Sequence, residues 1–217
     1  MDCVLFDFDG TLTRRDSFRL LVGRFLRRSP ARLLLIAFGL PLFIATGLLR
    51  MDKRYVKSWI LWCCTIGAGP RRSFADIGTL ALADFAQPQF WNDEVCERLM
   101  AHRQVGERVI VCTASGSEWV APMLAARGLV CDEVIGSVLA YRLGGIILAS
   151  PNCYAQEKVK RMANILASHR VVASYSDHPS DLPMLNRAEF AWIVNPKPRF
   201  LARFKRKLTV PWKLITD

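Results

Sequence analysis

Residues 4–11 read Val-Leu-Phe-Asp-Phe-Asp-Gly-Thr, and they give the clearest indication of the fold. The apolar run Val4–Phe8 stops at Asp9-Gly10, as a buried parallel strand would. Alternation along a strand places Asp7 and Asp9 on the same side, and Gly10 lets the chain turn away tightly. The stretch therefore predicts a buried strand with two carboxylates at its carboxyl end.

Three further apolar runs follow, and each ends where small or polar residues begin: 108–112, 171–175 and 190–194. Helical patterns lie between or beside them at 92–102, 117–127 and 156–168. Alternation of strands and helices predicts an α/β fold, with a Rossmann-like parallel sheet and helices on both faces. Two short runs, 138–142 and 146–148, are joined at Gly144-Gly145 and predict a β-hairpin.

The first two predicted sheet strands are separated by a long and mostly helical segment, residues 14–105. We expect this segment to be a helical cap inserted into an α/β core formed by residues 1–13 and 106–217. Within it, Leu33–Leu49 runs for 17 residues without a charge. Basic residues bracket this apolar run: Arg24, Arg27, Arg28 and Arg32 precede it, and Arg50, Lys53 and Arg54 follow it.

Composition excludes several classes of protein. The chain of 217 residues is 52% hydrophobic, with a mean hydropathy of +0.18 that is too low for a multi-span membrane protein. Its seven cysteines include no Cys-x-x-Cys pair and no zinc-ligand spacing, so we expect neither a structural zinc nor a disulfide framework. The N-terminal residues lack a positive segment, so we expect no signal peptide and a reducing, cytosolic compartment.

The net charge of +11 is concentrated in two segments. Residues 14–54 carry a net +8 and residues 197–217 a net +6, which suggests a surface that faces polyanions. The alternative is two solvated faces. The tail 197–213 mixes aromatic and basic residues, and fits a membrane-surface segment, a nucleic-acid contact or a disordered end. We favour the first, since nothing else in the sequence indicates nucleic-acid binding.

The pair Asp7 and Asp9 is the strongest chemical signal. One carboxylate can attack phosphorus, while its neighbour protonates the leaving oxygen and later activates water. Sites in open α/β sheets lie at the carboxyl ends of strands, where this pair is expected. The alternative is that these acids merely end a strand in a solvated turn.

Later positions suit the same chemistry. Thr113 follows a strand and can bond a phosphoryl oxygen, although such a threonine is often only a helix cap. Lys158 can neutralise charge on a transferred group, although a solvated helix lysine is the default. Asp177 and Asp181 suit Mg²⁺, although Asp181 can equally cap a short helix. Two acids, a hydroxyl, a lysine and a metal-binding pair, in this order, are the parts that phosphoryl transfer needs.

The chain resembles the phosphatases of the haloacid dehalogenase superfamily. The resemblance is carried by DFDGT at 7–11, VCTAS at 111–115, QEKV at 156–159 and SDHPSD at 176–181. It implies that Asp7 is the nucleophile and Asp9 the general acid/base, with Thr113 and Lys158 completing the catalytic set. It also implies Mg²⁺ held by the Asp7 side chain, the Asp9 carbonyl and Asp177, with Asp181 in support. The expected phosphate contacts are Gly10, Thr11, Ala114 and Ser115.

Within this superfamily, a helical cap in this position implies the phosphoserine-phosphatase-like branch. Ser176 and Ala114 stand where these relatives tend to have glycine, which weakens an assignment to phosphoserine phosphatase itself. The apolar run, residues 59–67 and Cys153 are similar to the phosphatidylglycerophosphatase C family, bacterial enzymes of the inner membrane. This second resemblance implies a phospholipid substrate and an anionic membrane surface as partner, at the cytoplasmic face of the inner membrane.

The apolar run is too short and interrupted to span a bilayer, which takes about 20 apolar residues. Because Asp7 precedes the run and the other site residues follow it, a single crossing would split the site. We therefore expect the segment 31–50 to dock on the membrane, peripherally or as a re-entrant hairpin. The alternative is that the run is the buried core of the cap, in a cytoplasmic protein.

Three functions remain at this stage. They are a lipid phosphatase with a docking cap, a soluble small-molecule phosphatase such as phosphoserine phosphatase, and a non-catalytic protein on the same fold. The intact set of reacting groups argues against the third. A phosphoserine site needs a cap acid for the substrate ammonium, but no Asp or Glu occurs from Ser17 to Met51. Asp16 is the nearest candidate, and capping a helix is its alternative role.

Overall fold

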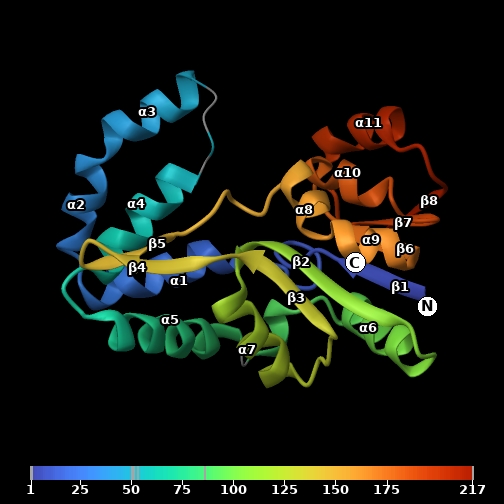
Figure 1. The fold of residues 1–217 in the computed structure, drawn as a ribbon, viewed down its shortest axis with the longest axis horizontal. Coiled ribbons are helices and arrows are strands. Elements are labelled where there is room, and N and C mark those ends of the chain that lie inside the picture. Colours follow the sequence, from blue (N-terminus) through green and yellow to red (C-terminus); the bar gives the residue numbers. More distant parts are fainter. Residues whose placement is uncertain (1, 50–51, 53, 86, 217) are drawn as a thin grey trace.

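A six-stranded parallel sheet forms the centre of the molecule (Figure 1). The computed structural model describes residues 2–49, 52, 54–85 and 87–216. The strand order is β3-β2-β1-β6-β7-β8. The strands are β1 (Asp2–Phe6), β2 (Arg108–Gly116), β3 (Glu133–Ser137), β6 (Arg170–Ser176), β7 (Phe190–Val194) and β8 (Trp212–Ile215). The predicted Rossmann-like α/β fold is confirmed.

Side-chain alternation along β1 divides the core between the two faces of the sheet. Val4 and Phe6 pack into one apolar cluster with α6 (Asp93–Gln104) and α7 (Ser117–Arg127). Cys3 and Leu5 point to the opposite cluster. That second face is covered by α8 (Gln156–Arg161), α9 (Ala163–Ser168) and α10 (Leu182–Leu185). With both faces covered, the central strands are buried and apolar throughout, as their sequences require.

All but the last of the described α-helices between β1 and β2 form a separate group beside the carboxyl ends of the strands, which we call the helical cluster (Figure 1). They are α1 (Ser17–Arg28), α2 (Arg32–Phe38), α3 (Leu40–Leu48), α4 (Arg54–Thr65) and α5 (Pro70–Phe85). The predicted hairpin forms as β4 (Leu139–Arg142) and β5 (Gly145–Leu148). It packs on α4: the Ile146 N–H donates to Thr65 Oγ1 at 2.7 Å, and the Leu148 N–H donates to Ser58 Oγ at 3.1 Å.

The apolar run folds as α2 and α3, which meet at Gly39. A Cβ at Gly39 would lie 2.2 Å from Trp59 Nε1, so only glycine lets the α2–α3 junction sit so close to α4. Ile36 packs inward, whereas most large side chains of the run face outward. The exposed ones are Leu33, Leu34, Leu35, Phe38, Leu40, Ile44, Leu48 and Leu49. The alternative of a buried cap core is therefore wrong for most of this run.

Over the described residues, no helix has both the length and the apolar character that a bilayer crossing needs. Arg50 and Lys53, two of the basic residues expected beside the run, lie outside the described residues.

Several boundaries differ from the sequence prediction. Strand β1 ends at Phe6 rather than Phe8, because Phe8 turns into the loop and packs edge-on against Trp91. The predicted helix 156–168 is broken at Met162 into α8 and α9, with Lys158 of α8 anchored at the sheet edge and Ile165 of α9 in the core. Strands β3 and β8 and helix α11 (Pro198–Lys207) were not predicted. Of the three alternatives for the tail, the disordered end is therefore wrong.

Candidate active site

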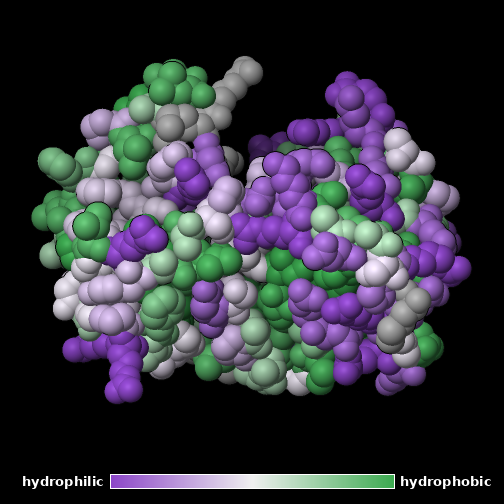
Figure 2. Space-filling view, viewed as in Figure 1, coloured by the Kyte–Doolittle hydropathy of each residue, from purple (hydrophilic) through white to green (hydrophobic). Residues whose placement is uncertain are grey.

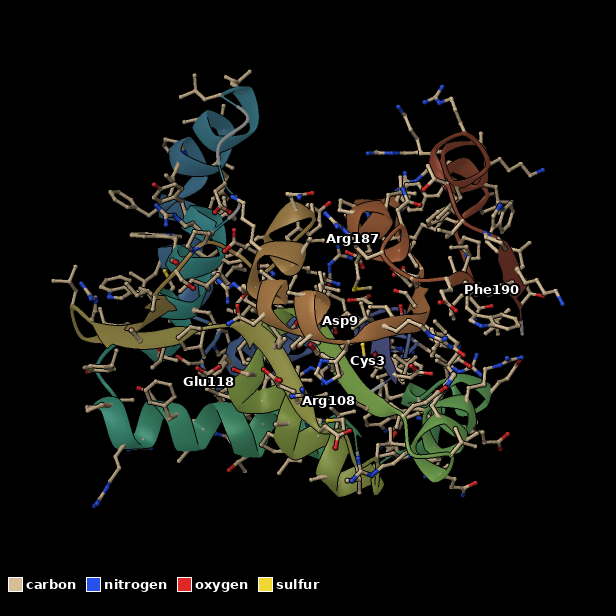
Figure 3. The ribbon with its side chains drawn as sticks, turned by 45° about the vertical axis from the view of Figure 1, so that its right-hand side comes forward. Cys3, Asp9, Arg108, Glu118, Arg187 and Phe190 are labelled. Atoms are coloured by element: carbon tan, nitrogen blue, oxygen red, sulfur yellow. The ribbon has the colours of Figure 1, made fainter. Side chains whose placement is uncertain are left out.

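The carboxyl ends of β1, β2 and β6 meet at one edge of the sheet, beside a cleft of about 800 Å³. Asp7 and Asp9 follow β1, and Asp177 follows β6. Figure 3 shows Asp9 near the middle of the molecule, between the helical cluster and the helices that follow β6. The predicted site residues that line the cleft are Asp7, Asp9, Gly10, Thr113, Ala114, Ser115, Lys158, Asp177 and Asp181.

Asp7 and Lys158 form the centre of this site. Lys158 is 1% exposed, and its Nζ donates to Asp7 Oδ1 at 2.6 Å and to Asp181 Oδ2 at 2.9 Å. Burial by itself lowers the lysine pKa, but Asp181 and Asp7 raise it well above its usual value, so the ammonium stays charged. Burial raises the pKa of Asp7 to about 7, although Lys158 opposes the shift. Lys158 therefore fixes the orientation of the buried Asp7 carboxylate, which lines the cleft.

Asp9 is held from two directions. Its Oδ1 accepts the backbone N–H of Ser17 at 2.6 Å, and its Oδ2 accepts the Ser115 hydroxyl at 2.5 Å. Burial first, and then the charge of Asp16, raise the pKa of Asp9, while the hydrogen bonds from Ser115 and Ser17 oppose the rise. A raised pKa favours the protonated acid, which is the form a proton donor needs.

Gly10 and Thr11 connect the β1 loop to Asp177. Gly10 has a φ of +86°, and a Cβ there would lie 2.6 Å from Asp177 Oδ2. Glycine is thus required both by the backbone conformation and by the close approach of this carboxylate. Thr11, which is fully buried, donates to Asp7 Oδ2 at 3.2 Å and accepts the Asp177 N–H at 3.1 Å. It ties the two acids together rather than lining the cleft.

Ser176, which departs from the glycine usual in the resembling family, has a clear role here. Its hydroxyl donates to Asp181 Oδ2 at 2.8 Å, on the same oxygen that accepts from Lys158. Asp181 is 2% exposed and makes no side-chain cap of α10, so the helix-cap alternative for this residue is wrong.

The acids of this edge carry more negative charge than Lys158 can offset. Burial, together with the charges of Asp7 and Asp181, raises the pKa of Asp177 to about 8. A divalent cation beside Asp7 and Asp177 would remove this repulsion, and carboxylate oxygens are the ligands that Mg²⁺ prefers. The described residues contain no group of three His, Cys, Asp or Glu side chains placed to hold a metal. That is compatible with Mg²⁺, which takes few carboxylates and keeps several waters.

The carboxyl-terminal part of β2 contacts the helical cluster through a lysine that the sequence did not single out. Lys57 Nζ of α4 donates to the Ala114 carbonyl at 2.9 Å and to Asn152 Oδ1 at 3.1 Å. Ser137 donates to the same two acceptors at 3.0 and 3.1 Å. Thr113 is fully buried, and its Oγ1 accepts the Ser115 N–H at 3.0 Å. Lys57 therefore connects α4 to the end of β2 that carries Thr113, which lies within the strand and not after it as predicted.

The rim of the cleft is basic. Beyond Lys57 and Lys158, its cations are Arg14, Arg15, Arg19, Lys197 and Arg199. Asp16 also lines the cleft, and it caps α1 by accepting the Arg19 N–H at 2.9 Å. Sequence reasoning missed Ser17, Lys57 and Asn152 because each acts through contacts that are distant in the chain. The signal for Ser17 was its position at the start of a helix.

A family model described as haloacid dehalogenase-like hydrolase matches residues 4–186. Protein CicA of Caulobacter vibrioides is 31% identical over 190 residues, covering 86% of this chain and 82% of that protein. A probable phosphatase of Mycobacterium tuberculosis is 31% identical over 117 residues, covering 48% of this chain and 37% of that protein.

Solved structures share the fold at lower identity. A protein of unknown function from Bordetella pertussis Tohama I has a TM-score of 0.74 at 22% identity, covering 99% of this chain and 97% of that one. A phosphoserine phosphohydrolase-like protein from Francisella tularensis has a TM-score of 0.57 at 17% identity, covering 89% and 87%. At such low sequence identities, these similarities show a shared fold and nothing more.

Proposed function

This chain belongs to the haloacid dehalogenase-like hydrolase family and is a phosphatase, and we propose that it hydrolyses a phosphate monoester through an aspartyl phosphate on Asp7. The observation that carries this proposal is the pairing of two unlike carboxylates at one strand end. Asp7 accepts a hydrogen bond from the charged Lys158, whereas Asp9 accepts from the neutral Ser115 hydroxyl and from the Ser17 backbone N–H. Acids in different environments take different roles.

In the first step, a carboxylate oxygen of Asp7 attacks phosphorus and the ester bond breaks. The leaving alkoxide takes the proton of Asp9, while Lys158 and the Thr113 hydroxyl stabilise the phosphoryl oxygens. In the second step, Asp9, now ionised, takes a proton from the attacking water. The acyl phosphate bond breaks, which restores the Asp7 carboxylate and the protonated Asp9 and releases inorganic phosphate.

We propose that the protein uses Mg²⁺, held by the Asp7 side chain, the Asp9 carbonyl and Asp177, with Asp181 supporting through Lys158 and Ser176. When bound, the cation would neutralise charge on the transferred phosphoryl group. Its support is the set of acids buried at this edge: burial, together with the charges of the neighbouring acids, raises the pKa values of Asp7 and Asp177. Gly10, Ala114 and Ser115 line the space where the phosphate would lie.

The proposed substrate is phosphatidylglycerophosphate, whose dephosphorylation gives phosphatidylglycerol. This lipid carries a phosphodiester beside the monoester and has no ammonium group, which suits a cleft with a basic rim. In a phosphoserine site, a carboxylate should face the substrate ammonium. Asp16, the one described cleft acid outside the proposed reaction set, is already engaged with the backbone of α1. A soluble monoester such as phosphoserine remains the alternative substrate.

We propose further that residues 14–105 act as a cap whose segment 31–50 docks on the cytoplasmic face of the inner membrane. The exposed apolar side chains of α2 and α3 support this, because a contiguous apolar surface of this kind usually marks an interaction site. The headgroup phosphate lies at the bilayer surface, so docking would bring the cleft to the substrate without extracting the lipid.

A substrate panel with the purified full chain and Mg²⁺ tests the proposal. We expect kcat/KM for phosphatidylglycerophosphate in mixed micelles to exceed that for phosphoserine by about 100-fold or more, the size of a few lost charge contacts. A higher value for phosphoserine would replace the lipid by a soluble substrate. No hydrolysis of any monoester, including p-nitrophenyl phosphate, would contradict the phosphatase assignment itself.

A further inference from the structure

We propose that α11 and the turn before it form a second contact with an anionic bilayer, across the cleft from the helical cluster that carries α2 and α3. The inference rests on the proposed membrane-bound function. It assigns a role to the basic tail and fixes which side of the molecule faces the lipid.

The charge of this segment is one-sided. The exposed cations are Lys197, Arg199, Arg203, Lys205, Arg206 and Lys207, and no Asp or Glu occurs from Phe190 to Thr216. Over the described residues, none of these six lies within ion-pair distance of a carboxylate. Other arginines of the sheet domain behave differently: Arg103, Arg108 and Arg127 pair with Asp132, Glu133 and Asp93. The cations of α11 therefore have their full charge available to an external anion.

The helix is fixed in its orientation by its apolar face. Phe204 is fully buried against Leu182 and Leu185 of α10. At the C-terminal end, Asn186 donates to the Lys207 carbonyl at 3.1 Å and accepts the Thr209 N–H at 3.0 Å. With Phe204 held inward, helical geometry places Arg199, Arg203 and Arg206 together on the outward face. These cations are presented by an anchored helix and not by a loose tail.

The position of α11 relates it to the cleft and to the apolar helices. Lys197, Arg199 and Phe200 line one rim of the cleft, and Phe18 and Lys57 of the helical cluster line it from the other side. Figure 1 shows α3 and α11 rising on the same side of the molecule. In Figure 2, hydrophobic side chains gather at the top over α3 and hydrophilic ones over α11, with a notch between them. One flat surface can therefore touch both.

The two contacts suit two layers of a bilayer. Exposed apolar side chains gain by entering the acyl region, whereas guanidinium and ammonium groups gain by staying among anionic headgroups. A nucleic acid would match α11 but would gain nothing from the adjacent apolar helices. The combination favours an anionic lipid surface as the partner.

Vesicle binding with a matched pair of variants tests the inference. Arg203→Gln/Arg206→Gln removes two outward charges of α11, and neither residue lines the cleft. The control Arg71→Gln/Arg142→Gln removes two exposed arginines from α5 and the hairpin. Each cation near an anionic surface contributes about fivefold in affinity, so we expect the α11 variant to bind phosphatidylglycerol vesicles roughly 20- to 30-fold more weakly. The control should change little, and both variants should hydrolyse p-nitrophenyl phosphate like the unmodified chain.

Equal vesicle affinity of the α11 variant and the unmodified chain would overturn the inference. Tighter binding of the unmodified chain to a DNA or RNA oligonucleotide than to these vesicles would overturn it and assign α11 to nucleic acid. Hydrolysis of p-nitrophenyl phosphate without any vesicle binding would overturn the inference while leaving the phosphatase intact. Charge-dependent vesicle binding without any phosphatase activity would support the inference and refute the proposed function.

Discussion

The carboxyl edge of the sheet and the α2–α3 segment both depart from the usual pattern of polar residues outside and apolar residues inside, but in opposite ways. The sheet edge buries acids and a lysine, whereas α2 and α3 expose leucine, isoleucine and phenylalanine. Buried charges are costly unless they are paired, and contiguous apolar surface is unusual on a protein that acts alone. The charged side chains of the sheet edge and the apolar side chains of α2–α3 are thus each in an environment that is unfavourable for them.

The difference lies in how each region offsets its cost. At the sheet edge, Lys158, Ser176 and Thr11 supply internal partners to Asp7 and Asp181, and only part of the charge is left for a ligand. In α2–α3, Ile36 packs inward, but Phe38 and Leu48 are 81% and 79% exposed. The first region is therefore suited to a small anion and a cation, and the second to an extended apolar partner.

The largest expected effect comes from the acids that follow β1. Asp7→Asn should reduce turnover of both lipid and soluble monoesters by about 10⁴-fold or more, because it removes the attacking oxygen. Asp9→Asn should cost about 10²- to 10⁴-fold, the usual contribution of a positioned proton donor. The measurement is kcat on each substrate. Asp93→Asn is the matched control, because Asp93 is an exposed acid of α6 that does not line the cleft, and this variant should stay near unmodified activity.

Removal of Mg²⁺ should impair the chemistry at the carboxyl edge of the sheet and should not change the apolar surface of α2–α3. EDTA should abolish hydrolysis of both substrates, and Mg²⁺ should restore it. Mg²⁺ should also raise the melting temperature of the unmodified chain, because a bound cation offsets the repulsion among Asp7, Asp177 and Asp181. Asp177→Asn should lose most of this rise, measured by calorimetry. A full Mg²⁺-induced rise in Asp177→Asn would show that the cation binds elsewhere.

The smallest of the three effects should come from α2–α3, and it should distinguish this segment from the sheet edge because only turnover of the lipid should fall. Phe38→Ser/Leu48→Ser should reduce lipid turnover by roughly 10- to 100-fold, since the loss of two partly inserted apolar side chains costs about 2 kcal/mol in total. Hydrolysis of p-nitrophenyl phosphate should be unchanged. Val105→Ser/Val130→Ser, at exposed apolar positions outside the helical cluster, is the control and should affect neither substrate. Equal losses on both substrates would mean that α2–α3 supports the fold and not docking.

The sequence was most informative where the signal is local. A buried strand that ends at Asp7-Phe8-Asp9-Gly10 predicts its own geometry, since strand alternation and a glycine turn act within a few residues. The same holds for the end of β2, which carries Thr113, and for Asp177 after β6. These positions meet because the carboxyl ends of parallel strands share one edge.

What the sequence could not supply depends on long-range packing. Lys57 reaches Ala114 and Asn152 across the cleft, and nothing near Lys57 in the chain marks that contact. Strand β8 is recognisable only through its pairing with β7, because its sequence is mixed apolar and basic. The break at Met162 carries no proline or glycine, and follows from the separate anchoring of α8 and α9. Exposure of the apolar run likewise depends on tertiary packing, because no second layer covers α2 and α3 among the residues that the structure describes.

The most direct test of the central claim is detection of the phosphorylated enzyme. The full chain is mixed with Mg²⁺ and an excess of substrate, quenched in acid within milliseconds, digested and analysed by mass spectrometry. The proposed mechanism predicts a phosphoryl group on the peptide that contains Asp7, and no such group in Asp7→Asn. In Asp9→Asn the phosphorylated enzyme should accumulate if the breakdown of the intermediate is slowed more than its formation. Full hydrolytic activity in Asp7→Asn, or a phosphoryl group on another residue, would contradict it.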